Sequence, residues 1–153
     1  MRVEFINPFV SAAYKVLENM GNQKIEKGKL AVKSSPVAGA EVNSLIGVTG
    51  DVKGQVLYSM TEQTAKKLAE TMLMGMPVTE FDELCKSAIS ELGNMITGNA
   101  ASELSNAGIN CIITPPSLVM GNNVMVSFKD AQILIIPLIT DFGEFTIYVA
   151  LTD

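Results

Sequence analysis

Hydrophobic residues recur every three or four positions in three stretches of the chain, and this period predicts three amphipathic helices. The first helix begins at Pro8, because proline is tolerated in a first turn, and it ends at Gly21. The second covers residues 61–75, and the third covers residues 81–106. Glycine or proline follows each helix, so all three have a defined end.

Most other stretches are rich in β-branched and apolar residues and predict strands. A first strand is expected over residues 25–33, and residues 45–60 predict a hairpin that turns near Gly50. Within this hairpin Gly54 indicates a bulge or the close approach of another backbone. Five further strands are expected at 109–114, 118–120, 123–129, 131–139 and 144–151. Pro137 lies inside an apolar strand and therefore predicts a sheet edge or a bulge.

The order of these elements repeats once along the chain, although the two copies share few residues. The first helix is followed by a strand, by Pro36 and by a hairpin, and the helix over 81–106 is followed by a strand, by Pro116 and by a hairpin. This pattern predicts an α+β domain built from two α-β-β-β halves. No linker or low-complexity segment interrupts the chain, so residues 1–153 are expected to form a single domain.

The helix over 81–106 has an unusual polar face. Its apolar side is formed by residues at helical spacing, namely Phe81, Leu84, Cys85, Ala88, Ile89, Leu92, Met95 and Ile96. Another side carries one polar residue or glycine per turn, namely Ser87, Glu91, Asn94 and Gly98. Small residues flank this side, namely Ser90, Gly93, Thr97 and Ala101. A solvated face normally carries long charged side chains, whereas this nearly flat face allows another macromolecule to come close.

The spacing Glu-x-x-Asn is a weak signal by itself, because it occurs three times in the chain. The pair Glu4/Asn7 precedes the first predicted helix, and Asn106 suits the end of a helix. Only Glu91 and Asn94 lie in the middle of a helix among small residues. From the spacing alone, an ordinary pair of solvated side chains is the competing interpretation.

Gly93 and Gly98 also need an explanation, since each destabilises a helix interior by roughly 0.8–1 kcal/mol relative to alanine. Close approach of a partner is one explanation. Close packing against the backbone of this same protein is the other, and the sequence does not distinguish between them.

Composition excludes several classes of function. The net charge of −5, with 11 basic residues scattered along the chain, argues against binding of nucleic acid. The absence of histidine excludes Ser-His-Asp and Cys-His nucleophile systems and histidine-ligated zinc. Cys85 and Cys111 are too few and too far apart for a thiolate metal site, so no metal site is expected. Chemistry must use carboxylates, amides, hydroxyls, lysines or groups supplied by a partner.

No segment of the chain predicts secretion or insertion into a membrane. The N-terminal residues lack the continuous apolar region and the cleavage pattern of a signal peptide. The longest apolar run, residues 133–139, has the length of a strand. The chain is therefore expected to be cytoplasmic, with no membrane partner.

Three segments of the chain resemble a known family. They are LIGVTGDVKGQVLYSMTEQTAKKLAETMLM, SAISELGNMITGNAASELSNAGI and TPPSLVMG. These segments are similar to the CheX group of the CheC/CheX/FliY family of bacterial chemotaxis phosphatases, and the similarity extends over nearly the whole chain. The family signature is Ser or Asp, three residues, Glu, two residues and Asn, which Ser87, Glu91 and Asn94 match. The proline expected downstream is supplied by Pro115-Pro116.

The resemblance implies a CheC-like fold of two pseudo-repeats, with long helices packed on an antiparallel sheet, and a homodimer. Members of the CheX group keep one acid-amide pair, and pairing Pro36 with Pro116 places Ser11 and Tyr14 at the corresponding positions of the first copy. One site is therefore expected.

The resemblance further implies hydrolysis of the aspartyl phosphate on a CheY-type receiver. Asn94 would position the attacking water, and Glu91 would pair with the active-site lysine of the receiver. The docking face would comprise Ser87, Ser90, Glu91, Thr97, Gly98 and Ala101. No cofactor is expected in this chain, because the receiver would carry the Mg²⁺. The alternatives are a receiver-binding module without hydrolysis and a structural dimer that buries this face.

Overall fold

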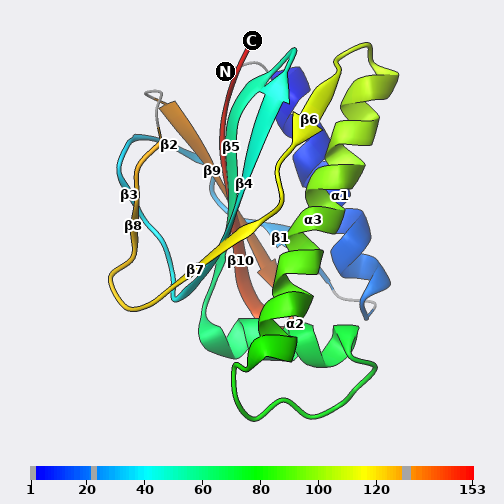
Figure 1. The fold of residues 1–153 in the computed structure, drawn as a ribbon, viewed down its shortest axis with the longest axis vertical. Helices are drawn as coiled ribbons and strands as arrows, with labels where there is room; N and C mark the ends of the chain where they lie inside the picture. Colours follow the sequence, from blue (N-terminus) through cyan, green and yellow to red (C-terminus); the bar gives the residue numbers. More distant parts are fainter. Residues whose placement is uncertain (1–2, 22–23, 129–131) are drawn as a thin grey trace.

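The fold has three layers, in which an eight-stranded sheet lies between two long helices and a small pair of strands (Figure 1). The computed structural model describes residues 3–21, 24–128 and 132–153. The helices are α1 (Val3–Asn19), α2 (Glu62–Met72) and α3 (Glu83–Asn106). The strands are β1 (Glu26–Lys27), β2 (Ala31–Ser34), β3 (Val37–Ala38), β4 (Val42–Gly50), β5 (Lys53–Met60), β6 (Cys111–Ile113), β7 (Ser117–Met120), β8 (Met125–Val126), β9 (Gln132–Thr140) and β10 (Gly143–Thr152).

Every pairing in the large sheet is antiparallel, and the strand order is β1-β9-β10-β5-β4-β6. Strand β2 joins the sheet beside β9, and β7 joins it beside β4. Each half of the chain therefore places its edge strands against the hairpin of the other half. The prediction of two α-β-β-β halves on an antiparallel sheet is confirmed.

The strand register corrects the alignment of the two halves. Ala31 lies opposite Ile135 on β9, and Ser117 lies opposite Leu45 on β4, so Ala31 and Ser117 occupy equivalent positions. Pro116 comes directly before Ser117, whereas Pro36 follows Ala31 by five residues. The two prolines are therefore not equivalent. The helices nevertheless keep the predicted offset of 80, because the buried positions of α1 coincide with those of α3, so the pairing of Ser11 with Glu91 and of Tyr14 with Asn94 is retained.

Helix α1 begins earlier than predicted. It starts at Val3, and Pro8 lies inside it with its side chain buried. Phe5 and Ile6 are buried as well, because the apolar stripe of the helix continues before the proline. The prediction that Glu4 and Asn7 precede the helix is therefore wrong, since both belong to α1.

The predicted strand over 25–33 is divided into β1 and β2, and Pro137 lies opposite the interruption. Lys27 pairs with Leu138 and Ala31 pairs with Ile135, so the edge strand contains one extra residue here. The Gly28 N–H still donates to the carbonyl of Pro137 at 2.7 Å. The bulge predicted from Pro137 is confirmed.

The hairpin of β4 and β5 is also confirmed, and Gly54 explains one of its features. Gly54 has φ of +147°, and a Cβ atom there would overlap the carbonyl oxygen of Ala150 on β10. Of the strand expected over 123–129, only Met125–Val126 forms β8, and residue 129 lies outside the described residues.

Helices α1 and α3 pack against each other and against one face of the sheet, where the largest apolar cluster lies (Figure 1). The opposite face carries a smaller cluster beneath the β3–β8 pair, which includes Leu57, Phe128 and Tyr148. None of the helices in the described residues is both long enough and apolar enough to cross a membrane.

Candidate active site on helix α3

The start of α3 is fixed by the side chain of Asp82, which caps the helix. Its carboxylate accepts the N–H of Cys85 at 3.0 Å, and the helix then continues for 24 residues. The buried side comprises Cys85, Ala88, Ile89, Leu92, Gly93, Ile96, Thr97, Ala100 and Leu104. The sequence predicts Leu84 and Met95 on the apolar side, but they are 51% and 39% exposed, because the side of α3 that packs against the protein is narrower than the apolar stripe in the sequence.

The outward side of α3 forms one wall of a shallow groove of about 460 Å³. The groove is lined by Glu83, Lys86, Ser87, Ser90, Glu91, Asn94, Pro116 and Leu118. Four of the predicted site residues thus meet in one groove, while Gly98 and Ala101 lie beyond its lining on later turns of α3. Ser87 and Glu91 are exposed, and Asn94 is half-buried.

The second wall is formed by the segment that enters β7. Leu118 lies opposite Ser44 on β4, so the sheet fixes its position. Pro115 and Pro116 have no N–H to donate to the sheet, and the edge strand is interrupted there between β6 and β7. This interruption leaves Pro116 beside α3 and explains why a downstream proline accompanies the acid-amide pair.

The side chains of Glu91 and Asn94 make no hydrogen bond or ion pair with another described residue. They are three residues apart on one helix face, which places their Cβ atoms about 5–6 Å from each other. A carboxylate offers acceptors only, whereas a carboxamide offers both an acceptor and two donors. The groove can therefore hold a cation at Glu91 and orient a water molecule at Asn94.

Thr97 differs from the prediction that it belongs to the docking face. It is fully buried, and its hydroxyl donates to the carbonyl of Gly93 at 2.8 Å. Because that bond uses the only hydroxyl hydrogen of Thr97, the 2.7 Å contact with Tyr58 must be donated by the Tyr58 hydroxyl. Thr97 ties α3 to β5 and is not accessible to a partner.

Burial raises the pKa of Tyr58 far above its ordinary value, and the hydrogen bond with Thr97 offsets only part of this rise. The phenol therefore remains a donor throughout the physiological range. Tyr58 therefore keeps its hydrogen bond to Thr97 at physiological pH and holds the nearby turn of α3, which carries Asn94, against β5.

The two helical glycines have different surroundings. A Cβ atom at Gly93 would lie 2.9 Å from the Ser44 hydroxyl oxygen and 3.3 Å from a ring carbon of Tyr58. A Cβ atom at Gly98 would meet nothing within 4 Å. Packing against this protein's own sheet therefore explains Gly93, whereas nothing within the described residues explains Gly98.

Sequence reasoning missed Glu83, Lys86 and Leu118 in the groove. Lys86 pairs with Glu83, with 3.1 Å between its amino nitrogen and the carboxylate oxygen. Glu83 lies in the first turn of α3, where a negative charge interacts favourably with the helix dipole, and its side chain is 92% exposed. The signal that would have found Lys86 is its position directly before Ser87 on the same turn.

The described residues contain no group of three His, Cys, Asp or Glu side chains that could hold a metal ion. Cys85 is buried and Cys111 is half-buried, and both are free thiols.

Comparisons with known proteins address this groove and this fold. The profile of the family described as chemotaxis phosphatase CheX matches residues 42–138, which include β4, α3 and the second wall of the groove. This chain belongs to the CheX family. The CheY-P phosphatase CheX of Thermotoga maritima is 32% identical over 126 residues, which are 82% of this chain and 81% of that protein.

Solved structures of CheX and CheC-like proteins have the same fold. A CheC-like superfamily protein from a Shewanella species has a TM-score of 0.89 and 31% identity, and all of both chains is covered. The CheX–CheY–BeF3–Mg²⁺ complex from Borrelia burgdorferi has a TM-score of 0.84 and 30% identity, with 99% of this chain and 100% of that chain covered. The prediction of a CheC-like fold in the CheX family is confirmed.

Proposed function

We propose that this CheX family member hydrolyses the aspartyl phosphate of a CheY-type response regulator. The observation that carries the proposal is the unpartnered acid-amide pair, Glu91 and Asn94, in an open groove on the outward side of α3. The Thermotoga relative is named as a phosphatase of phosphorylated CheY, and the Borrelia complex contains CheX bound to CheY, which supports the same partner class here.

Asn94 positions the attacking water in this mechanism. Its amide oxygen accepts a hydrogen bond from the water and directs a lone pair of the water oxygen toward the phosphorus. A P–O bond to water forms as the acyl P–O bond breaks, the receiver aspartate leaves with the electron pair, and one proton of the water passes to a phosphoryl oxygen, so that inorganic phosphate is released. An aspartyl phosphate is an activated acyl phosphate, so positioning without a histidine base is sufficient. A hundredfold acceleration needs only about 2.7 kcal/mol.

Glu91 holds the receiver in register. Its exposed carboxylate pairs with a lysine at the receiver's phosphorylation site, and the small side chain of Ser87 lets the helix enter that site. Ser90 lies at the edge of the same contact, and Gly98 and Ala101 extend it along α3. The receiver supplies the Mg²⁺ that neutralises the phosphoryl oxygens.

A phosphate-release assay with several purified receivers from the same organism tests this proposal. Glu91→Lys should weaken binding of the receiver at least tenfold, because it places two cations together where an ion pair is proposed. Glu103→Lys is the matched control, since Glu103 is also exposed on α3 but lies outside the groove. Equal losses in the two variants, or no accelerated phosphate release with any receiver, would contradict the proposal.

A receiver-binding module without hydrolysis is the second candidate. It would form a phosphorylation-dependent complex in which the lifetime of the phosphate does not change. We also infer a homodimer, supported by the apolar side chains exposed along edge strands, such as Val32 and Ile112. Light scattering should then give about twice the monomer mass of 16.4 kDa, and a monomer at all concentrations would exclude the dimer.

A further inference from the structure

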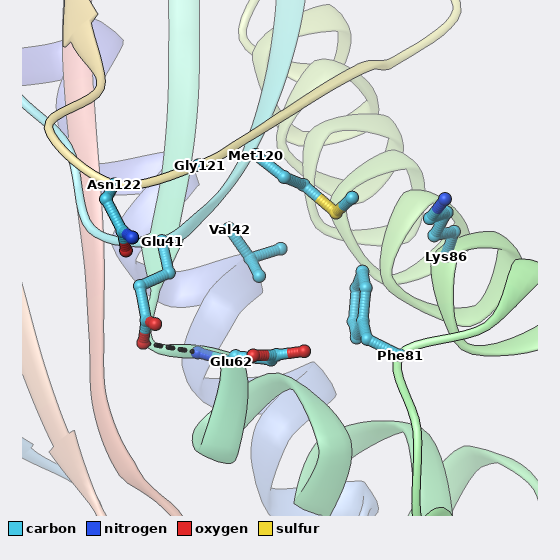
Figure 2. Close-up of a pocket in the computed structure, with 8 residues that line it drawn as sticks. All are labelled: Glu41, Val42, Glu62, Phe81, Lys86, Met120, Gly121 and Asn122. Carbon is cyan, nitrogen blue, oxygen red and sulfur yellow. Dashed lines mark hydrogen bonds between the residues drawn. The ribbon is translucent and has the colours of Figure 1, made fainter.

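A second pocket of about 230 Å³ adjoins the groove, where β4, β7 and the starts of α2 and α3 converge (Figure 2). It is lined by Glu41, Val42, Glu62, Phe81, Lys86, Met120, Gly121 and Asn122. Lys86 lines both the pocket and the groove, so the two hollows form one continuous surface.

The pocket has an apolar side and an acidic side. Val42, Phe81 and Met120 form the apolar side, and the Met120 side chain extends toward the Phe81 ring (Figure 2). Glu41 and Glu62 form the acidic side. The carboxylate of Glu41 accepts the N–H of Glu62 at 3.1 Å, which holds it at the start of α2.

The acidic side retains acceptors for a ligand. The carboxylate of Glu62 is directed across the pocket toward Phe81, and one of its oxygens, Oε1, forms an ion pair with the amino group of Lys66 at 4.0 Å. Lys86 lies beyond the Phe81 ring, its amino group points away from both carboxylates, and it is paired with Glu83. The open acceptors of Glu41 and Glu62 are therefore not neutralised by Lys86.

This arrangement fits a basic side chain, and arginine best. The aliphatic stem of arginine would lie against Val42 and Met120, its guanidinium would reach the carboxylates of Glu41 and Glu62, and the Phe81 ring would offer its face. An acidic ligand would be repelled by both carboxylates, and a purely apolar one would leave them desolvated and unpaired.

We propose that this pocket is a specificity subsite that receives a basic side chain of the receiver bound at the Glu91–Asn94 groove. The inference rests on the proposed function, because the occupant is part of the same partner. A standard protein interface buries about 800 Å² on each side, so a protein seated in the groove also covers the adjoining surface. The pocket is continuous with the groove through Lys86, so the bound receiver covers it. The negative charges of Glu41 and Glu62 require that the receiver present a basic side chain there.

The test measures affinity and hydrolysis separately with the full-length chain. Receivers of the same organism are activated with beryllofluoride and Mg²⁺, and their dissociation constants are measured by titration calorimetry. The double variant Glu41→Gln/Glu62→Gln keeps the size and hydrogen-bonding capacity of both side chains. It should weaken binding about tenfold at low salt and less at high salt, because the lost attraction is between charges. Phosphate release at saturating receiver should be unchanged.

Two controls make the result specific. Glu103→Gln removes an exposed charge of α3 outside both hollows and should leave affinity within twofold of wild type. On the receiver, alanine substitution of each surface arginine and lysine should identify one residue whose loss has little further effect in the double variant.

The outcomes separate this inference from the proposed function. Unchanged affinity in the double variant, with wild type still binding and hydrolysing, overturns the subsite and leaves the phosphatase proposal standing. If wild type binds no activated receiver, both proposals fall. If the double variant alters the mass of the free protein in light scattering and not its affinity for receiver, the occupant is a second copy of the chain and the subsite is again overturned.

Discussion

Gly93 and Gly98 lie on different sides of the same helix, and they should respond in opposite ways to alanine. At Gly93 the new methyl group would press on Ser44 and Tyr58, which should lower the free energy of unfolding by about 1–3 kcal/mol despite the better helix propensity of alanine. At Gly98 the space is open, so alanine should raise stability by up to about 1 kcal/mol. Chemical denaturation of both variants measures the difference.

Ser44 supplies the control for this comparison. Its hydroxyl is buried without a hydrogen-bond partner in the described residues, so Ser44→Ala alone should be neutral or slightly stabilising. Combined with Gly93→Ala it should recover part of the lost stability, because the nearest clashing atom is gone. If the changes in the free energy of unfolding of the two single variants simply add in the double variant, the contact with Ser44 is not the cause of the destabilisation by Gly93→Ala.

At the scale of elements, local signals predicted where most helices and strands begin and end. Thr61 accepts the N–H of Thr64 at the start of α2, and Asp82 does the same for α3. The exception is α1, where a proline suggested a start but burial of Phe5 and Ile6 extends the helix by five residues before it. Burial of these side chains stabilises the helix by more than the backbone hydrogen bond that Pro8 cannot make, and this difference cannot be predicted from the local sequence.

Helix α3 depends on Tyr58 for its buried attachment to β5, and this attachment should depend on pH. Tyr58→Phe removes the hydrogen bond to Thr97 and should lower stability at pH 8 by about 0.5–1.5 kcal/mol. Unfolded tyrosine ionises near pH 10, whereas the pKa of the folded Tyr58 is raised by burial. The wild type therefore keeps this contribution below pH 10 and loses it as pH rises further, so the two stability curves should converge in alkali.

Denaturant titrations from pH 8 to pH 11 measure this convergence. Tyr14→Phe is the control, because its hydroxyl has no hydrogen-bond partner within the described residues, and it should leave stability at pH 8 unchanged. A difference between wild type and Tyr58→Phe that stays constant through pH 11 would show that the Tyr58 hydroxyl does not act as described.

At the scale of the whole molecule, the sequence predicted one wall of the groove and not the other. Ser87, Ser90, Glu91 and Asn94 share a helix face, which follows from helical period alone. Leu118 reaches the groove only because β7 pairs with β4, a contact between residues more than 70 positions apart in the chain. The prediction that Thr97 binds a partner was wrong for a related reason. Helical period alone does not show which part of the polar face of α3 is turned toward the sheet.

The pseudo-symmetry of the molecule was visible in the order of elements, but the register of its edge strands was not. The offset that the two prolines suggest is kept by the buried positions of α1 and α3, whereas the pairing of Ala31 and Ser117 with the opposite hairpins gives the edge strands a different offset. Each half contributes an interrupted edge strand to the other half, and in the second half the interruption leaves Pro116 beside α3. The fold thus brings the acid-amide pair and its proline together from separate elements.

The central claim is that Asn94 positions the hydrolytic water while Glu91 and its neighbours hold the receiver. The most direct measurement is the rate of phosphate release from a phosphorylated receiver at saturating concentrations of Asn94→Ala, with receiver affinity measured in parallel. Asn99→Ala is the matched control, because Asn99 is exposed on the same helix outside the groove. We predict that Asn94→Ala loses roughly a hundredfold in rate, equivalent to about 2.7 kcal/mol, and that its affinity for receiver stays within about twofold of wild type. Full activity in Asn94→Ala, or the same loss in Asn99→Ala, would contradict the account.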